Sequence, residues 1–195
     1  DNVMTSNLTQ RGIAAAMAVL AAMPAEAAEA PLRQYQAVKT RDGKPIRLVL
    51  YRRTTGAKGR PVLFLVHGSS TSALTSFDLH VPGHGEYSMM NVFARAGFDV
   101  WTMDHEGYGK SDRTDGNSDI ASGVEDLKAA MPVIQRETGQ SRCHFLGESS
   151  GALRAAAFAM VMPQAVGRMV LAAHTYTGKG SPTLAKRAEG LEYFK

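Results

Sequence analysis

The chain has 195 residues, of which 44% are hydrophobic and 21% are charged, and this size and composition suit one globular domain rather than two. The 22 lysine and arginine residues exceed the 18 aspartate and glutamate residues by only four, and the excess forms no basic run, which argues against nucleic acid as a partner. Cys143 is the single cysteine, which excludes an intrachain disulfide and a zinc site built from cysteines.

The first thirty residues differ in composition from the rest. Arg11 precedes an apolar run at residues 13–23, and an A-x-A sequence follows at residues 25–27. A positive start, a short apolar middle and an A-x-A end are the parts of a secretory signal peptide. The run is also shorter than the ~20 apolar residues that a stable membrane span needs. We therefore expect residues 1–30 to be a signal peptide and the protein to be exported; the alternative is an alanine-rich helix that stays attached to a cytoplasmic protein.

The next part of the chain predicts a hairpin and then a buried strand. Two stretches of alternating polarity, at 33–40 and 44–53, flank the dipeptide Asp42-Gly43. Asp-Gly between alternating stretches is a strong signal for a two-residue hairpin turn. The continuous apolar run VLFLV at 62–66 predicts a strand that is buried on both faces.

From residue 88 onward the patterns of helices and strands alternate. Helices are expected at 88–96, 119–137 and 150–162, and strands at 98–103, 143–146 and 168–173. The long helix carries apolar residues at helical spacing, namely Val124, Leu127, Met131 and Ile134. A hairpin followed by this alternation implies an α/β fold, with a mostly parallel sheet and helices on both faces. Ligands of such sheets bind at the carboxyl ends of the strands, so the residues directly after each strand are the informative ones.

The strand at 143–146 leads into Gly147-Glu148-Ser149-Ser150-Gly151. The G-x-S-x-G spacing selects Ser149, because Ser150 has no glycine two places before it. A serine on such a strand-to-helix turn is held in a strained backbone, and the flanking glycines leave room where a Cβ would clash. The helix amino terminus also favours negative charge that develops beside the hydroxyl. Ser149 is therefore the candidate nucleophile, and the alternative is an ordinary serine N-cap.

The loop His67-Gly68-Ser69-Ser70 follows the buried strand at 62–66. An acyl-transfer enzyme needs two N–H donors for the oxyanion, one from the residue after the nucleophile and one from this loop. Ser150 is expected to supply the first donor and Ser69 the second, with Ser70 as the near alternative and as a candidate pocket-lining residue. His67 is expected to bond to neighbouring backbone or to line the pocket, rather than to act as a base.

Polar residues also follow the strands at 98–103 and 168–173. Asp104 is expected to accept N–H groups of the loop at 107–109, rather than to serve as a catalytic acid. His105 and Glu106 are expected to share that role or to line the entrance of the site. His174 is interpreted as a pocket-lining residue rather than as the base.

Three segments, VLFLVHGSS, GFDVWTMDHEGYGKSD and HFLGESSGA, occur in the order and spacing of the α/β-hydrolase superfamily, and residues 32–173 resemble its amino-terminal part. The resemblance implies a Ser–His–acid triad, a covalent acyl-enzyme and a cap domain inserted near residue 174. A serine nucleophile resembles the esterases and lipases of the superfamily, and it disfavours the relatives that open epoxides or remove halides with an aspartate. No motif calls for a metal or an organic cofactor.

One departure from the family pattern concerns the other triad members. In the family the order is Ser, acid, His, with the last two after the seventh and eighth strands. The residues after Ala173 contain His174 but no pattern of further strands. We therefore expect the amino-terminal part of a longer hydrolase, with its core at 31–173 and the start of a cap or linker at 174–195. The sheet would stop after its sixth strand, and a downstream segment of the same protein would complete it.

The predicted function is hydrolysis of a small-molecule carboxylic ester through an acyl-enzyme on Ser149, with the N–H groups of Ser69 and Ser150 as the oxyanion hole. The catalytic histidine and acid are expected outside the chain. A carbon–carbon bond hydrolase or a peptidase is the alternative on the same fold, because specificity lies in the cap and the pocket. A non-catalytic relative used for binding is a third hypothesis, which predicts a damaged elbow or oxyanion loop.

Overall fold

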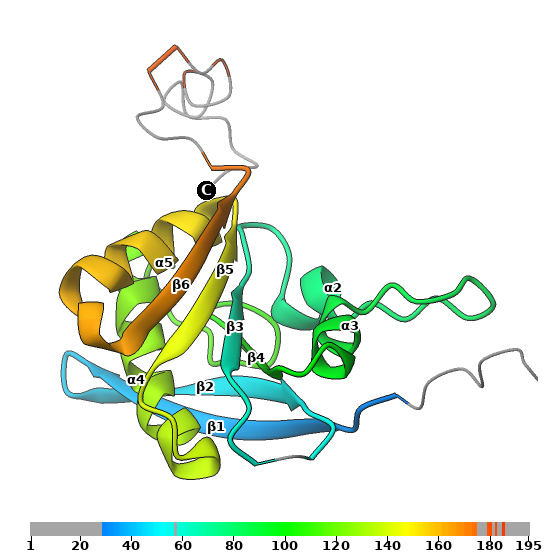
Figure 1. Ribbon diagram of the computed structural model, residues 1–195. Helices are drawn as coiled ribbons and strands as arrows, with labels where there is room; N and C mark the ends of the chain where they lie inside the picture. Colours follow the sequence, from blue (N-terminus) through cyan, green and yellow to red (C-terminus); the bar gives the residue numbers. More distant parts are fainter. Residues whose placement is uncertain (1–28, 57, 175–178, 181, 183–184, 186–195) are drawn as a thin grey trace, which may run out of the picture.

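A computed structural model describes residues 29–56, 58–174, 179–180, 182 and 185. They form a six-stranded sheet in the order β1-β2-β4-β3-β5-β6 with helices on both faces (Figure 1). The strands are β1 (Leu32–Arg41), β2 (Lys44–Arg53), β3 (Val62–Val66), β4 (Asp99–Asp104), β5 (Cys143–Glu148) and β6 (Val166–Ala172). The helices are α2 (Ala73–Phe77), α3 (Met89–Arg95), α4 (Ile120–Thr138) and α5 (Ser150–Val161), and a 3-10 turn (Pro163–Ala165) precedes β6.

The amino-terminal hairpin confirms the turn that the sequence predicts. Asp42 and Gly43 both have positive φ angles, 52° and 74°, and Arg41 pairs with Lys44 across the turn. Two positive φ angles give a hairpin turn whose twist matches that of the strands. β2 then pairs antiparallel with β4, whereas β4, β3, β5 and β6 are mutually parallel. The sheet is therefore mostly parallel, as predicted.

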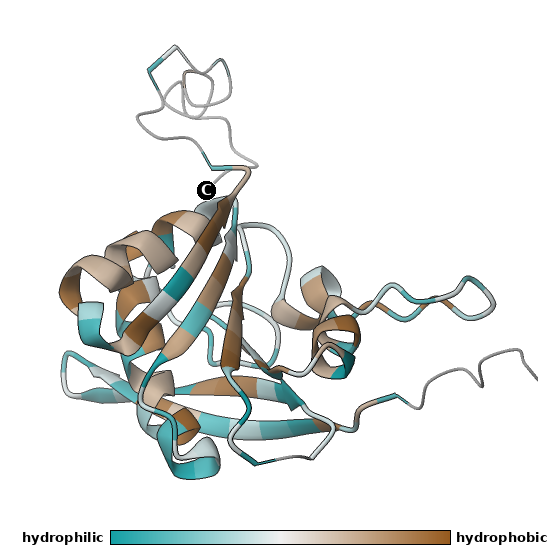
Figure 2. Cartoon of the chain, viewed as in Figure 1, coloured by the Kyte–Doolittle hydropathy of each residue, from teal (hydrophilic) through white to brown (hydrophobic). Residues whose placement is uncertain are grey.

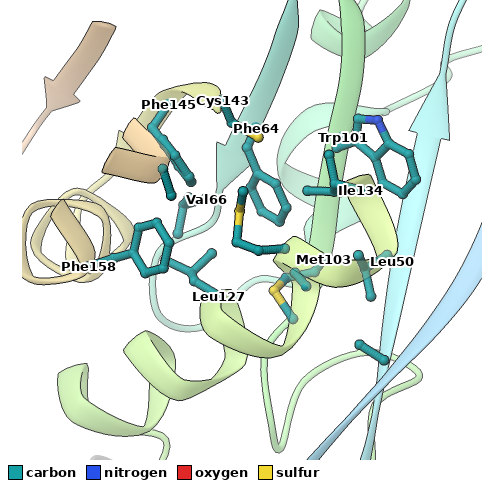
Figure 3. Close-up of a cluster of buried hydrophobic side chains, with 14 of the residues drawn as sticks. Leu50, Phe64, Val66, Trp101, Met103, Leu127, Ile134, Cys143, Phe145 and Phe158 are labelled. Atoms are coloured by element: carbon teal, nitrogen blue, oxygen red, sulfur yellow. The ribbon is translucent and has the colours of Figure 1, made fainter. Parts of the chain in front are cut away.

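Helices α4 and α5 cover one face of the sheet, and this face carries the larger hydrophobic core (Figure 1). The rings of Phe64 and Phe145, on neighbouring strands, have centroids 5.7 Å apart, and Phe158 of α5 lies 5.4 Å from Phe145. Figure 3 shows Phe158 beside Leu127 of α4 in this cluster. The apolar face that the sequence predicts for α4, from Val124 to Ile134, is buried here.

The opposite face of the sheet is covered by α2 and α3. Leu65 of β3, Phe77 of α2 and Met90 of α3 are almost completely buried in this second cluster. All five residues of β3 are buried, which confirms a strand covered on both faces. Figure 2 shows hydrophobic residues along β3, in the middle of β2 and on α5, whereas β1 is mostly hydrophilic.

Helix α2 has no counterpart among the predicted elements. It is five residues long, which is too short to show helical periodicity in the sequence. Its start is fixed by polar contacts instead. The Thr75 hydroxyl accepts the N–H of Ser72, and the Asp104 carboxylate accepts the N–H of Ala73 at 2.9 Å.

The predictions for the two ends of the chain fall mostly on residues that the structure does not describe. Residues 1–28 of the signal peptide predicted at 1–30 lie outside the described residues, and so does most of the predicted cap or linker at 174–195. The described part begins with Glu29, and Ala30 is buried, with its N–H bonded to the Asn91 side chain at 3.0 Å. No helix in the described part of the chain is long and apolar enough to cross a membrane.

Candidate active site

Ser149 lies on the turn between β5 and α5 with an unusual backbone conformation. Its φ and ψ angles are 54° and −123°, and a positive φ is uncommon for a residue that carries a Cβ. Its N–H donates to the carbonyl of Ala172 at 2.9 Å, so β6 holds the turn in place. The residue is exposed, and its side chain makes no capping hydrogen bond to α5. The strain that the sequence motif predicts is therefore present, and the geometry differs from that of an ordinary serine N-cap.

The two glycines of the motif are required by space. A Cβ on Gly147 would lie 2.5 Å from the carbonyl oxygen of Gly151 and 2.6 Å from the Cα of Ala152. A Cβ on Gly151 would overlap the carbonyl oxygen of Val66 and lie 2.5 Å from that of His67. These atoms are backbone and cannot swing aside. The first turn of α5 therefore packs directly on the end of β3, as the clash argument predicts.

The loop after β3 approaches Ser149, the candidate nucleophile, closely. A Cβ on Gly68 would be 3.0 Å from the Cβ of Ser149, and the hydroxyl oxygens of Ser69 and Ser150 are 2.9 Å apart. Ser150 is the first residue of α5, so its N–H has no partner within the helix. Within the described residues the Ser69 N–H donates to no acceptor. Ser70, the alternative donor, is exposed and occupies a turn with φ of 75°.

His67 is completely buried, and backbone groups bond to both nitrogens of its ring. Nδ1 donates to the carbonyl of Gly68 at 2.7 Å, and Nε2 accepts the N–H of His105 at 3.2 Å. Burial, with a further contribution from His105, lowers the pKa of His67 to about 3. The ring is therefore neutral, and its lone pair is occupied, which confirms the prediction that His67 is not a base. Because the ring has no exposed surface, it does not line an open pocket.

Asp104 organises the loop after β4, as the sequence predicts. One carboxylate oxygen accepts the N–H of Lys110 at 2.9 Å and the hydroxyl of Tyr51 at 2.8 Å, and the other accepts the N–H of Ala73. A Cβ on Gly109 would overlap the Asp104 carboxylate and would lie only 2.5 Å from the more distant of its two oxygens, so the turn needs glycine there. Both oxygens are used by the fold, which leaves no role as a triad acid.

His105 and Glu106 belong to a buried ionic cluster that sequence reasoning missed. Lys39 of β1 lies 2.6 Å from the Glu106 carboxylate and 2.7 Å from that of Asp126 in α4, and Asp126 also accepts Nδ1–H of His105 at 2.9 Å. We call Lys39, His105, Glu106 and Asp126 the buried ionic cluster, since each is less than 10% exposed. Of the two roles expected for His105 and Glu106, lining the entrance is therefore wrong, whereas Glu106 does bind within the loop after β4, where it accepts the Thr114 hydroxyl.

The protonation states of the cluster follow from burial and from the charges beside each group. Burial by itself raises the pKa of Asp126, but hydrogen bonds from His105 and Lys39 bring it below its ordinary value. Burial also raises the pKa of Glu106, but hydrogen bonds from Lys39 and Thr114 bring it below its ordinary value. Burial lowers the pKa of His105. At neutral pH the cluster thus holds two carboxylates, one ammonium and one neutral imidazole.

These shifts predict a protein that loses stability in mild acid. His67 and His105 have lower pKa values in the folded than in the unfolded chain, so the unfolded chain takes up their protons first as the pH falls below about 6.5. Each such histidine costs about 1.4 kcal/mol of unfolding free energy per pH unit below its unfolded pKa. The lowered pKa values of Asp126 and Glu106 add a further loss below about pH 4.5.

Denaturant unfolding at pH 7.5, 6.0 and 5.0 measures this loss. The His67→Gln variant removes one titrating group, and its stability should depend less steeply on pH than that of the parent. A free energy of unfolding that stays constant from pH 7.5 to 5.0 would contradict the assignment of two neutral buried histidines.

His174 lies at the same edge of the sheet as Ser149. Glu148 pairs with Ala172 at the ends of β5 and β6, and His174 follows two residues later as an exposed residue. No side chain of the described residues forms a hydrogen bond with the Ser149 hydroxyl. The described part of the chain thus holds the candidate nucleophile, the amino terminus of α5 and the candidate oxyanion loop.

The sequence of the chain matches a known protein family. A family model described as serine aminopeptidase, S33, matches residues 80–191, which is more than half of the chain. The chain belongs to this family. The α/β-hydrolase fold that the sequence motifs predict is thereby confirmed, together with the mostly parallel sheet.

Individual relatives of this α/β-hydrolase differ in their named activities. A 2-hydroxy-6-oxononadienedioate/2-hydroxy-6-oxononatrienedioate hydrolase of Paraburkholderia phymatum is 36% identical over 120 residues, which are 60% of this chain and 37% of that protein. Human gastric triacylglycerol lipase is 31% identical over 135 residues, 62% of this chain and 33% of the lipase. The chain thus spans little more than a third of these relatives.

A solved structure shows the same fold. The crystal structure of an epoxide hydrolase from Vigna radiata aligns with a TM-score of 0.58 over 83% of this chain and 46% of that one, at 18% identity. At this identity the likeness concerns the fold alone.

Proposed function

We propose that the protein is a serine hydrolase that cleaves a carboxylic ester, or a related acyl bond, of a small molecule through a covalent intermediate on Ser149. The observation that carries this proposal is the conformation of Ser149, at φ 54° and ψ −123° between two glycines that have no room for a Cβ. Backbone strain of this kind costs about 1–3 kcal/mol and concentrates at functional sites. An ordinary N-cap would avoid the strain and bond its side chain to the helix.

The oxyanion hole is proposed to consist of the N–H groups of Ser69 and Ser150. The loop after β3 and the start of α5 meet beside Ser149, as the hydroxyl contact between Ser69 and Ser150 at 2.9 Å indicates. The Ser150 N–H has no helical partner, and the dipole of α5 adds positive potential at the same place. Two donors beside a nucleophile are what a tetrahedral oxyanion requires.

The proposed reaction follows from these positions. Ser149 Oγ attacks the substrate carbonyl, its proton passes to a histidine, and the carbonyl oxygen takes up the negative charge between the two N–H donors. Collapse of this intermediate expels the alcohol with the proton from the histidine and leaves an ester on Ser149. Water then releases the acid by the same steps. The histidine and its acid are proposed to come from residues other than those described.

A carbon–carbon bond hydrolase is the second candidate. Relatives named as 2-hydroxy-6-oxononadienedioate/2-hydroxy-6-oxononatrienedioate hydrolases, such as that of Paraburkholderia phymatum, favour it, because hydrolysis of such a diketo acid breaks a carbon–carbon bond. The family description, serine aminopeptidase, also keeps a peptidase open. A binding protein without activity is disfavoured, because the elbow and the oxyanion loop are both intact.

The test uses a fluorophosphonate probe and a panel of substrates on the full-length protein. The probe reacts only with an activated serine, and peptide mass spectrometry should find it on Ser149. The panel contains a p-nitrophenyl ester, a 2-hydroxy-6-oxo-dienoate and an aminoacyl p-nitroanilide, and the ester is expected to be hydrolysed fastest. A protein that neither reacts with the probe nor hydrolyses any member of the panel would overturn the proposal.

A further inference from the structure

A buried arginine lies directly behind the candidate oxyanion hole. Arg154 is on α5, one helical turn after Ser150, and is only 1% exposed. Burying a guanidinium is costly unless its hydrogen bonds are satisfied. No carboxylate of the described residues lies within ion-pair distance of it. The free-energy cost of burying the Arg154 guanidinium is thus not offset by a salt bridge within the described residues.

The partners of Arg154 are backbone carbonyls in two different loops. Nη1 donates to the carbonyl of His67 at 3.3 Å, and Nη2 donates to the carbonyl of Ser118 at 2.7 Å. The guanidinium carbon also lies 5.9 Å from the ring centroid of Tyr108. The side chain therefore connects the nucleophile helix with the loop after β3 and with the segment that precedes α4.

The surrounding backbone is shaped to admit this side chain. A Cβ on Gly123 of α4 would lie 2.7 Å from both Cγ and Nε of Arg154. Gly151 lets the first turn of α5 touch the same His67 carbonyl that Arg154 binds. Since the stem and the head of the arginine are both enclosed, its guanidinium has little freedom to move.

Two consecutive peptide carbonyls of the loop after β3 each accept a hydrogen bond from a buried side chain. Arg154 binds the carbonyl of His67, and the His67 ring binds the carbonyl of Gly68 at 2.7 Å. In a trans peptide the carbonyl and the following N–H point in opposite directions. Fixing the Gly68 carbonyl toward the buried ring therefore turns the Ser69 N–H the other way, out of the core.

We propose that Arg154, together with His67, is a positioning residue that fixes the Ser69 N–H relative to the Ser150 N–H, so that the two donors stay at the spacing an oxyanion needs. This inference rests on the proposed function. The arginine reaches the loop from the same helix that carries the Ser150 N–H. It therefore sets the distance between the two donors rather than the position of either one alone.

The effect of losing this contact should appear in the chemical step. Removing one donor from an oxyanion hole lowers kcat about 10²- to 10³-fold, because the donors act mainly on the transition state. A misplaced donor costs less, so we expect Arg154→Met to lower kcat about 10- to 100-fold with KM within about 3-fold of the parent value. The inhibition constant of a boronic acid, which mimics the tetrahedral state, should rise in parallel.

Matched variants separate positioning from a loss of stability. Phe158→Leu changes another fully buried side chain of α5, one turn further from Ser149, and should leave kcat within about 3-fold of the parent. Arg154→Lys keeps a cation but cannot bind both carbonyls as a planar fork, so its kcat should lie between those of the parent and Arg154→Met. It also provides a variant to measure if Arg154→Met does not fold.

The second positioning residue offers an independent test. His67→Asn retains an amide donor near Nδ1 for the Gly68 carbonyl, whereas His67→Gln retains an acceptor near Nε2 for the His105 N–H. If the Gly68 contact matters for the reaction, His67→Gln should lose more kcat than His67→Asn at similar melting temperatures.

The outcomes distinguish this inference from the proposed function. A parent protein without probe labelling or turnover overturns the proposed function. A parent that is active, with Arg154→Met or Arg154→Lys equally active, overturns the positioning role of Arg154. So does an equal loss of kcat in Phe158→Leu. The inference is supported if Arg154→Met has a lower kcat at unchanged KM and binds the boronic acid more weakly. It also requires that His67→Asn keeps a higher kcat than His67→Gln.

Discussion

Replacing Ser149 with alanine in the full-length protein is expected to lower kcat about 10⁴- to 10⁶-fold, the range in which loss of a nucleophilic serine falls. The backbone of the elbow is fixed by Gly147, Gly151 and the bond from the Ser149 N–H to Ala172, none of which needs the hydroxyl. The fold should therefore survive. Initial rates on the best substrate of the panel, with circular dichroism as the check on folding, give the measurement.

Ser150→Ala is the matched control. Its hydroxyl contacts that of Ser69, but the role proposed for Ser150 belongs to its backbone N–H, which alanine keeps. We expect a loss in kcat below about 10-fold, the scale of one exposed hydrogen bond of about 1 kcal/mol. Equal losses in Ser149→Ala and Ser150→Ala would show that the wrong serine has been assigned.

A glycine at position 149 links the strain to the function. Glycine adopts positive φ without the steric cost that a Cβ brings, and that cost is about 1–3 kcal/mol. Ser149→Gly should therefore unfold at a higher denaturant concentration than Ser149→Ala, although both are inactive. Equal midpoints would mean that the conformation at φ 54° stores little energy.

The parts of this fold that the sequence predicts well are the ones set by neighbouring residues. Asp42-Gly43 determines the hairpin turn locally, and VLFLV shows its burial within five residues. The elbow is also local, because Gly147 and Gly151 lie within a turn of Ser149. The ends of strands are predicted less accurately. β5 extends to Glu148 instead of residue 146, and β6 begins at Val166 instead of residue 168, because pairing between the two strands continues beyond their apolar residues.

The parts that the sequence does not reveal depend on residues far apart in the chain. Lys39 and Asp126 are 87 positions apart, and each alone has the pattern of a solvated surface charge. The one local signal for Lys39 was its place on the same face of β1 as the buried Ala37, since side chains alternate along a strand. Arg154 likewise resembles an exposed helix residue until the loops that it binds are placed around it.

Replacing Lys39 with methionine is expected to lower the free energy of unfolding by about 3–5 kcal/mol, the cost of removing one partner from a buried ion pair. The ammonium lies between two carboxylates, at 2.6 Å from that of Glu106 and 2.7 Å from that of Asp126, and it also donates to the Ser122 hydroxyl at 2.8 Å. Methionine fills much of the same space. The loss should therefore come from the uncompensated carboxylates rather than from a cavity. Denaturant unfolding at pH 7.5 measures it.

Lys44→Met is the control for this measurement. Lys44 begins β2 on the same hairpin but is exposed, so its replacement should change the free energy of unfolding by less than about 0.5 kcal/mol. A double variant, Lys39→Met with Asp126→Asn, removes the carboxylate for which Lys39 is the only cationic partner among the described residues. It should recover part of the stability that Lys39→Met loses, because less negative charge then remains buried without a cation.

The pH dependence of the difference between Lys39→Met and its parent decides whether charge is the cause. Without the ammonium, the pKa of Asp126 loses the lowering effect of Lys39 while burial still raises it, so this group takes up a proton in the folded variant as the pH falls. Protonation removes the repulsion and the desolvation cost. The deficit of Lys39→Met relative to its parent should therefore shrink between pH 7.5 and pH 5. A deficit that stays constant over this range would instead indicate a packing defect in the core. The two carboxylates would then be stabilised mainly by their other partners, which are Arg41, His105 and the Ser122 hydroxyl.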